Sequence, residues 1–204
     1  DRSRGLGDVY KRQVYGPIGQ LETITLKDWI RTFEVNVFGT VALCRSLIPL
    51  MKKRKRGCII NFSGGGDGPF PNFTAYSASK GAILRFTESL ATELKDFGIS
   101  VNAIAPGAVN TGLLPQVLKA GPNRAGAEFY QRSMIQAKDG GASPRKAADL
   151  ILFLASTNSM GLTGKFLSAI HDQPEKYMKH LKKIATSDIY NLRRIKPKDR
   201  GYDW

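Results

Sequence analysis

The stretch "GCIINFS", residues 57–63, decides how the rest of the chain is arranged. It is a short run of apolar, partly β-branched residues that ends in a serine, a pattern typical of a buried strand. Two similar runs follow it, "ISVNAIAPG" at 99–107 and "GKFLSAI" at 164–170, and helical patterns separate the three. Strict alternation of strand and helix predicts right-handed crossovers and a parallel sheet in an α/β fold.

Three helical patterns accompany these strands. Apolar residues recur near helical spacing from Leu26 to Met51, and Pro49 marks the expected end of that helix. A second helix is predicted from about Thr74 to Asp96, and a third over 143–157. Residues 112–140 mix short helices with Gly and Pro, which is typical of a mobile lid over a pocket.

The first thirteen residues do not fit this pattern. The segment "DVYKRQ", back-translated, resembles the end sequence of a transposon used to fragment DNA for sequencing, and residues 1–13 lack hydrophobic periodicity. We therefore interpret 1–13 as a non-native library scar, the alternative being a genuine basic arm.

The composition is that of a globular protein with excess positive charge. The 204 residues are 42% hydrophobic and carry a net charge of +14. No apolar run approaches the roughly 20 residues of a membrane span, so no membrane partner is expected. The run "KKRKR", 52–56, follows a helical pattern. Cations at a helix C-terminus complement the macrodipole, an interpretation favoured over a nucleic-acid patch, while an unknown acidic partner stays open.

The cysteines and histidines show no metal-ligand spacing. Cys44 and Cys58 lie in apolar segments, and His171 and His180 stand alone late in the chain. We expect small buried cysteines in a reducing, cytoplasmic compartment and no metal site.

Tyr76 and Lys80 stand one helical turn apart in "TAYSASK", with only small residues between them. A free phenol has a pKa near 10, and a neighbouring cation lowers it by stabilising the phenolate. Such a pair is weak support for an active site by itself, because short motifs match by chance.

Polar residues beside the predicted strand ends strengthen the case. Ser63 ends the first strand, and Thr111 follows the Pro-Gly that ends the second, where parallel sheets bind ligands. Asn36 interrupts an apolar helical face. The alternatives are a strand-end cap for Ser63, a satisfied core amide for Asn36 and a helix cap for Thr111.

With "VNVFGT", "GCIINFS", "YSASK", "VNAIAPG" and "GLTG", the chain resembles the short-chain dehydrogenase/reductase family from about Val14 to Ile170. The resemblance implies the C-terminal part of a doubly wound, parallel-sheet Rossmann fold with three α/β/α layers. It places the family's catalytic tetrad on Asn36, Ser63, Tyr76 and Lys80. The implied function is interconversion of an alcohol and a carbonyl by hydride transfer with NAD or NADP.

The resemblance also implies roles for these residues. Tyr76 is the expected proton donor or acceptor, and Lys80 is expected to hydrogen-bond the nicotinamide ribose as well. Ser63 orients the substrate oxygen, and Asn36, at a helical irregularity, holds a water that relays protons to Lys80. The expected contacts to the nicotinamide end are Tyr76, Lys80, Pro106, Gly107, Val109 and Thr111.

The family's first strands and Gly-rich phosphate turn have no counterpart in this sequence. We therefore expect 14–170 to be a partial Rossmann domain that alone binds cofactor poorly, is inactive and aggregates. Residues 171–204 are expected to form a C-terminal extension with one amphipathic helix, covering the active-site rim or contacting another subunit. Association into dimers or tetramers, through 26–51 and 74–96, is implied by the resemblance.

Three functions compete at this stage. The leading one is an oxidoreductase acting on a small alcohol or ketone, whose identity cannot be read from the lid. The second is a non-catalytic family relative that serves as a regulatory or scaffold subunit, and the third is a basic nucleic-acid binder.

Overall fold

The computed structural model describes residues 13–64, 67–172 and 174–204, without the side chains of Glu175 and Lys176. Of the suspected scar, only Gln13 therefore lies within the described residues.

Three parallel strands form one sheet in the order β1-β2-β3, as the alternation of strand and helix predicted. They are β1 (Gly57–Phe62), β2 (Ile99–Ala105) and β3 (Phe166–Ser168), and Gly57 lies opposite Ile99. β3 is shorter than the predicted 164–170. Gly164 has a positive φ of 74°, and the Ser168 N–H donates to Asp172 Oδ2, so the chain turns away at both ends.

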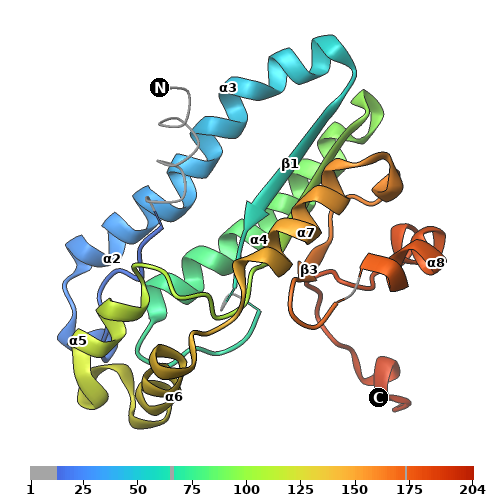
Figure 1. Ribbon diagram of the computed structural model, residues 1–204. Helices are drawn as coiled ribbons and strands as arrows, with labels where there is room; N and C mark the ends of the chain where they lie inside the picture. Colours follow the sequence, from blue (N-terminus) through green and yellow to red (C-terminus); the bar gives the residue numbers. More distant parts are fainter. Residues whose placement is uncertain (1–12, 65–66, 173) are drawn as a thin grey trace.

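Helices cover both faces of this sheet, and the described α-helices are labelled in Figure 1. They are α2 (Leu26–Phe33), α3 (Gly39–Arg54), α4 (Thr74–Leu94), α5 (Leu114–Ala125), α6 (Ala127–Asp139), α7 (Pro144–Ala155) and α8 (Pro174–Ala185). Short helical segments are η1 (Leu21–Thr23), η2 (Glu34–Phe38), η3 (Lys95–Phe97), η4 (Thr157–Ser159) and η5 (Pro197–Arg200). The predicted lid is thus the helix pair α5–α6.

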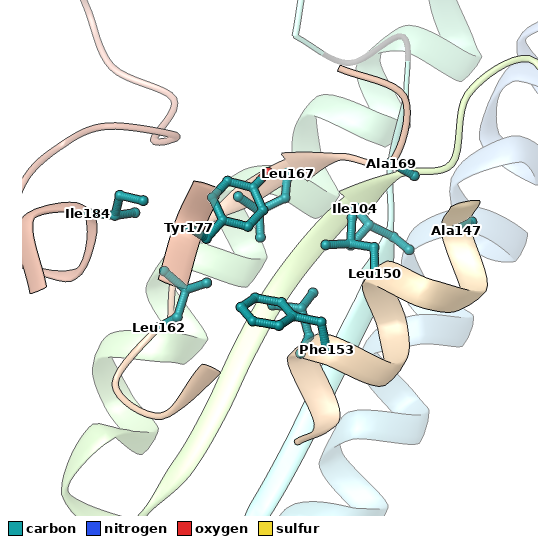
Figure 2. Close-up of a cluster of buried hydrophobic side chains, with 10 residues drawn as sticks. Ile104, Ala147, Leu150, Phe153, Leu162, Leu167, Ala169, Tyr177 and Ile184 are labelled. Carbon is teal, nitrogen blue, oxygen red and sulfur yellow. The ribbon is translucent and has the colours of Figure 1, made fainter. Parts of the chain in front are cut away.

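Each face of the sheet packs against its own apolar core, so the fold has three layers, with helices on both sides of the sheet. On one face, Ile59 of β1 packs with Cys44 of α3 and Leu90 of α4. On the other, Ile104 of β2 packs with Leu150 of α7. Figure 2 shows that second core, in which side chains from β2, β3, α7 and α8 lie together. The period-2 alternation of strand side chains divides the residues between these two cores.

The segments α2, η2 and α3 form one continuous helix over Leu26–Arg54, longer than predicted. Pro49 does not end it. Ile48 and Met51 pack against the core of α4 and β1, and this packing outweighs the lost backbone N–H of the proline. The helix is long and apolar enough to cross a membrane, with a mean hydropathy of 1.3 over 18 residues, of which 17% are buried. One such helix is a weak indication, because helices of soluble proteins pass the same test.

The C-terminal extension is fixed to the outer edge of the sheet. The Tyr190 carbonyl accepts a hydrogen bond from the Phe166 N–H of β3, at 2.9 Å. Buried Lys165 donates through Nζ to Ser187 O and to Asn191 Oδ1, at 2.6 and 2.7 Å. Asn191 Nδ2 in turn donates to Glu88 of α4. Residues 187–192 thus contact β3 and the two residues before it, Glu88 of α4 and, through Tyr190, Asp172 and Tyr177 of α8. The contacts expected from the sequence were with the active-site rim or another subunit.

Candidate active site

The N-terminal part of α4 places Tyr76 and Lys80 inside the protein. Their side chains are 6% and 3% exposed, which is unusual for a lysine. The two lie on one face of the helix, and Lys80 Nζ is 5.7 Å from the centroid of the Tyr76 ring. Lys80 Nζ also donates a hydrogen bond of 3.0 Å to the carbonyl oxygen of Phe62, the last residue of β1.

Ser63 follows β1 directly and is buried beside the same helix. Its N–H donates to the Ile104 carbonyl of β2, which extends the ladder by one residue. Its Oγ donates to the Lys80 carbonyl at 3.2 Å. Ser63 and Lys80 are therefore in direct contact at the carboxyl end of the strand, as the sequence predicted for the Ser63 position.

Asn36 lies in η2, a π-helical turn between α2 and α3, so the expected helical irregularity is present. Its Nδ2 donates to Ser79 Oγ at 3.0 Å and to Val14 O at 2.9 Å, and its Oδ1 accepts from the Val14 N–H. Ser79 Oγ donates onward to the Tyr76 carbonyl. Both N–H groups of the buried Asn36 amide are hydrogen-bonded, so the alternative of a satisfied core amide also fits this side chain.

The Tyr76 hydroxyl accepts a hydrogen bond of 2.8 Å from Gln13 Nε2. Burial raises the pKa of Tyr76 above its ordinary value, and the neighbouring Tyr15 adds to the rise, while the Gln13 hydrogen bond opposes it. The expected lowering of the Tyr76 pKa by Lys80 is not what this structure gives. Desolvation is the larger effect because both groups lie away from water.

Burial also changes Lys80. Desolvation lowers the pKa of its ammonium to about 8, because the charged form loses hydration and gains only one described carbonyl acceptor. The Lys80 ammonium therefore loses its proton at a pH closer to neutral than an exposed lysine does.

An aromatic cluster closes over Tyr76. Tyr15 meets the Tyr76 ring edge to face, with ring centroids 4.7 Å apart. Phe73 and Phe129 of α6 stack edge to face at 5.1 Å, and Val117 of α5 is buried in the same cluster. The α5–α6 pair is thus a cover over the tyrosine, in the place expected of a lid.

The segment after β2 lies at the same edge of the sheet. Gly107 has a φ of +87°, and a Cβ there would lie 2.4 Å from Ile170 Cγ1, so the turn requires glycine. Val109 forms a bridge with Gly141. Thr111 Oγ1 accepts from the Leu113 N–H at 3.4 Å, but Leu113 is itself the N-cap of α5 and the helix has no side-chain cap, so Thr111 is not its cap.

The residues that the structure describes contain no group of three or more His, Cys, Asp or Glu side chains that could hold a metal ion. Cys44 is buried, Cys58 is half-buried, and both are free thiols. His171 and His180 are exposed.

A family model described as short chain dehydrogenase matches residues 15–120, just over half of the chain. The chain belongs to the short-chain dehydrogenase family. The match includes the residues predicted as the tetrad and the segment from Pro106 to Thr111.

Characterised relatives and solved structures agree with this family. The chain is 35% identical to a cyclopentanol dehydrogenase of a Comamonas species over 142 residues, 69% of this chain and 55% of the relative. It is 34% identical to an inactive 2-(S)-hydroxypropyl-CoM dehydrogenase of Xanthobacter autotrophicus, over 72% of this chain and 64% of the relative.

Among solved structures, a 3-oxoacyl-[acyl-carrier protein] reductase of Brucella melitensis with bound NAD has a TM-score of 0.58 and 30% identity. It matches 75% of this chain and 54% of its own. This short-chain dehydrogenase thus spans little more than half the length of the cyclopentanol dehydrogenase and of the reductase.

Sequence reasoning missed several groups that contact the predicted tetrad, Val14 and Tyr15 among them. Gln13 was assigned to the scar, Ser79 was considered only a small spacer, and the Phe62 carbonyl has no side-chain signal at all. The position of Ser79, three residues after Tyr76 and so on the same helical face, is the one available signal.

Proposed function

We propose that this short-chain dehydrogenase family member is an NAD- or NADP-dependent oxidoreductase that interconverts a small alcohol and its carbonyl. The observation that carries the proposal is the position of Lys80, which is hydrogen-bonded to Ser63 and Phe62 at the carboxyl end of β1 and lies 5.7 Å from the Tyr76 ring. Ligands of parallel sheets bind at this edge.

Tyr76 is the proposed acid and base. When bound, a nicotinamide cofactor supplies or accepts the hydride. The Tyr76 hydroxyl gives its proton to the developing alkoxide in reduction and takes one back in oxidation. Protonated Lys80, one turn away on α4, stabilises the phenolate that forms, and its pKa of about 8 lets it exchange a proton near neutral pH.

Ser63 and Asn36 support this chemistry. Ser63 Oγ now donates to the Lys80 carbonyl, and rotation about its single side-chain torsion redirects the hydroxyl toward a substrate oxygen. Asn36 fixes Ser79, which is bonded to the Tyr76 carbonyl, and so holds the first turn of α4 in position.

The described residues suit only the nicotinamide end of the cofactor. The proposed contacts to that ring are Pro106, Gly107, Val109 and Thr111, which follow β2, and Gly107 and Thr111 are exposed there. The described residues contain no Gly-rich phosphate turn that opens a helix. Activity is therefore proposed for a protein that also binds the phosphate and adenosine end of the cofactor. In this chain Gln13, which we interpret as part of the scar, donates to the Tyr76 hydroxyl.

The test uses the product of the natural gene that encodes residues 14–204. Tyr76→Phe should lower carbonyl reduction by about 10²–10⁴-fold, the usual contribution of a general acid, while cofactor binding persists. Tyr15→Phe removes a hydroxyl from the adjacent ring and is the matched control. Unchanged turnover in Tyr76→Phe, with ketones and both cofactors, contradicts the proposal.

A second candidate is a non-catalytic regulatory or scaffold subunit. It is favoured by the relative named as inactive and by the Tyr76 hydroxyl and Asn36 amide, which are both engaged in internal hydrogen bonds. Cofactor binding without turnover in the wild-type gene product, over a broad range of alcohols and ketones, distinguishes this candidate from the first.

A further inference from the structure

Aromatic rings flank the proposed proton donor. Tyr15 meets the Tyr76 ring edge to face, with centroids 4.7 Å apart and planes at 66° to each other. Phe70, in the loop before α4, meets the same ring at 6.3 Å and 73°. Two rings from distant parts of the sequence therefore lie beside the side chain whose hydroxyl is proposed to meet the substrate oxygen.

Phe73 joins these two rings into one surface. Its ring lies 5.1 Å from that of Tyr15 and is stacked on that of Phe70 at 4.3 Å, with 12° between the planes. The Phe73 N–H donates to the Phe70 carbonyl, a turn that holds the loop in this shape. Phe73 is fully buried, whereas Tyr15 and Phe70 are only partly buried. We call Tyr15, Phe70 and Phe73 the aromatic wall.

The helix α6, at the lower left in Figure 1, covers this wall with one more ring. Phe129 meets Phe70 at 4.8 Å and Phe73 at 5.1 Å, both edge to face. Gly126 and Gly140 bound α6 with φ values of 86° and 87°, a region that glycine enters without strain. Glycines at both ends allow a helix to reorient, so a ligand ring can exchange contacts with Phe129.

The described members of the cluster around the wall carry no charge; they are Tyr15, Ile18, Phe70, Phe73, Tyr76, Val117, Ala120, Ala125, Phe129 and Tyr130. The nearby guanidinium groups have other partners. Arg124 Nε donates to the Ile18 carbonyl, and Arg132 pairs with Glu128. The cluster therefore offers no cation of its own to an acidic or phosphorylated substrate, and burial of an unpaired anion is unfavourable.

We infer that the substrate is an uncharged, apolar alcohol or ketone that carries a flat ring beside its reacting carbon, and that Tyr15 and Phe70 bind this ring. The inference names the substrate of the proposed reaction and so rests on the proposed function. A carbonyl oxygen hydrogen-bonded to the Tyr76 hydroxyl at about 2.8 Å brings the groups on the carbonyl carbon close to these two rings. Flat rings prefer edge-to-face contacts with aromatic side chains, the geometry that these rings already adopt with Tyr76.

Two other classes of uncharged substrate fit the aromatic wall less well. A sugar carries many hydroxyl groups, and burial of a hydroxyl against aromatic carbon without a hydrogen-bond partner is unfavourable. A saturated chain gains from apolar burial but makes no edge-to-face contacts between rings. A flat ring gains from both.

The experiment compares related ketones with the product of the natural gene that encodes residues 14–204, supplied with NADH and NADPH. The ketones are 1-indanone, its ring-saturated analogue octahydro-1-indanone, and the charged 1-indanone-5-carboxylate. We expect the highest kcat/KM for 1-indanone and a value at least about 100-fold lower for the carboxylate. Phe70→Leu should lower the preference for 1-indanone over the saturated ketone by about three- to tenfold. Phe97→Leu, in η3 before the start of β2, is the matched control and should leave the preference unchanged.

A ratio of two substrates does not depend on the fraction of folded enzyme, so a loss of stability in Phe70→Leu cannot imitate this result. Binding of isoindolin-1-one, a lactam with the shape of 1-indanone that hydride does not reduce, gives a readout without turnover. Calorimetry in the presence of cofactor should show about three- to tenfold weaker binding in Phe70→Leu and unchanged binding in Phe97→Leu.

The outcomes separate this inference from the proposed function. Faster turnover of the saturated or charged ketone, or equal binding of the lactam to Phe70→Leu and the wild type, overturns the inference. Binding of the lactam that depends on Phe70, without turnover of any ketone, supports the role of the aromatic wall and counts instead against the proposed function.

Discussion

At the scale of single residues, burial couples the protonation of Lys80 to folding. Its pKa is lowered from 10.5 to about 8, so between about pH 8 and 10 the unfolded chain holds more protons than the folded one. In this window Lys80 makes the free energy of unfolding rise with pH. Tyr15 and Tyr76, whose pKa values are raised, act in the opposite direction only above about pH 10.

The variant Lys80→Met isolates this effect. From about pH 7.5 to 10 the wild type should gain up to about 3 kcal/mol of stability relative to the variant, as measured by urea unfolding. Parallel pH profiles for the two proteins would show that Lys80 is hydrated in the folded state.

Gly107 illustrates a residue whose conformation the fold imposes. Gly107→Ala should lower the free energy of unfolding by about 2 kcal/mol, because the new Cβ meets Ile170 in a backbone at φ +87°. Gly112→Ala is the matched control, since nothing lies within 4 Å of its Cβ, and should change stability by less than about 0.5 kcal/mol. Equal melting temperatures for the two variants would show that the turn at residue 107 does not require glycine.

The candidate site could be predicted from sequence where local spacing determines it. Tyr76 and Lys80 lie close together because one helical turn separates them, and Ser63 contacts Lys80 because it follows a strand that packs on that helix. Gln13 and the Phe62 carbonyl could not be predicted, because their contacts depend on tertiary packing. The predicted lowering of the Tyr76 pKa by Lys80 was wrong for the same reason. Burial, which raises this pKa, cannot be inferred from local sequence.

At the scale of elements, residues 187–192 act as a clamp between β3 and α4. Asn191 is central, because it accepts from the buried Lys165 ammonium and donates to Glu88 and to the Gly164 carbonyl. Asn191→Ala leaves that ammonium with one fewer acceptor and should cost about 2 kcal/mol or more, as thermal denaturation can measure. Asn158→Ala, at an exposed site, should leave the melting temperature nearly unchanged. An unchanged melting temperature in Asn191→Ala would mean that water replaces the lost acceptor.

The elements themselves followed from periodicity and caps. Thr25 caps α2 through the Asp28 N–H, and Ser143 caps α7, whose extent matches the predicted helix closely. The end of α3 was predicted at Pro49 because proline usually stops a helix. Packing of Met51 beneath Gly57 carries the helix onward to Arg54, a contact between segments that no local rule contains.

At the scale of the whole molecule, repulsion from the net charge of +14 opposes association of copies, whereas exposed apolar surface favours it. Within the described residues, β1 is paired on one side only, and Leu43, Leu47 and Leu50 of α3 are exposed. Salt screens the repulsion, since the Debye length falls to about 10 Å at 0.1 M, and leaves apolar contacts intact. We therefore expect sedimentation velocity to show more self-association as sodium chloride rises, and less in the Leu47→Ser, Leu50→Ser variant. Association that weakens with salt would instead show that opposite charges join the copies.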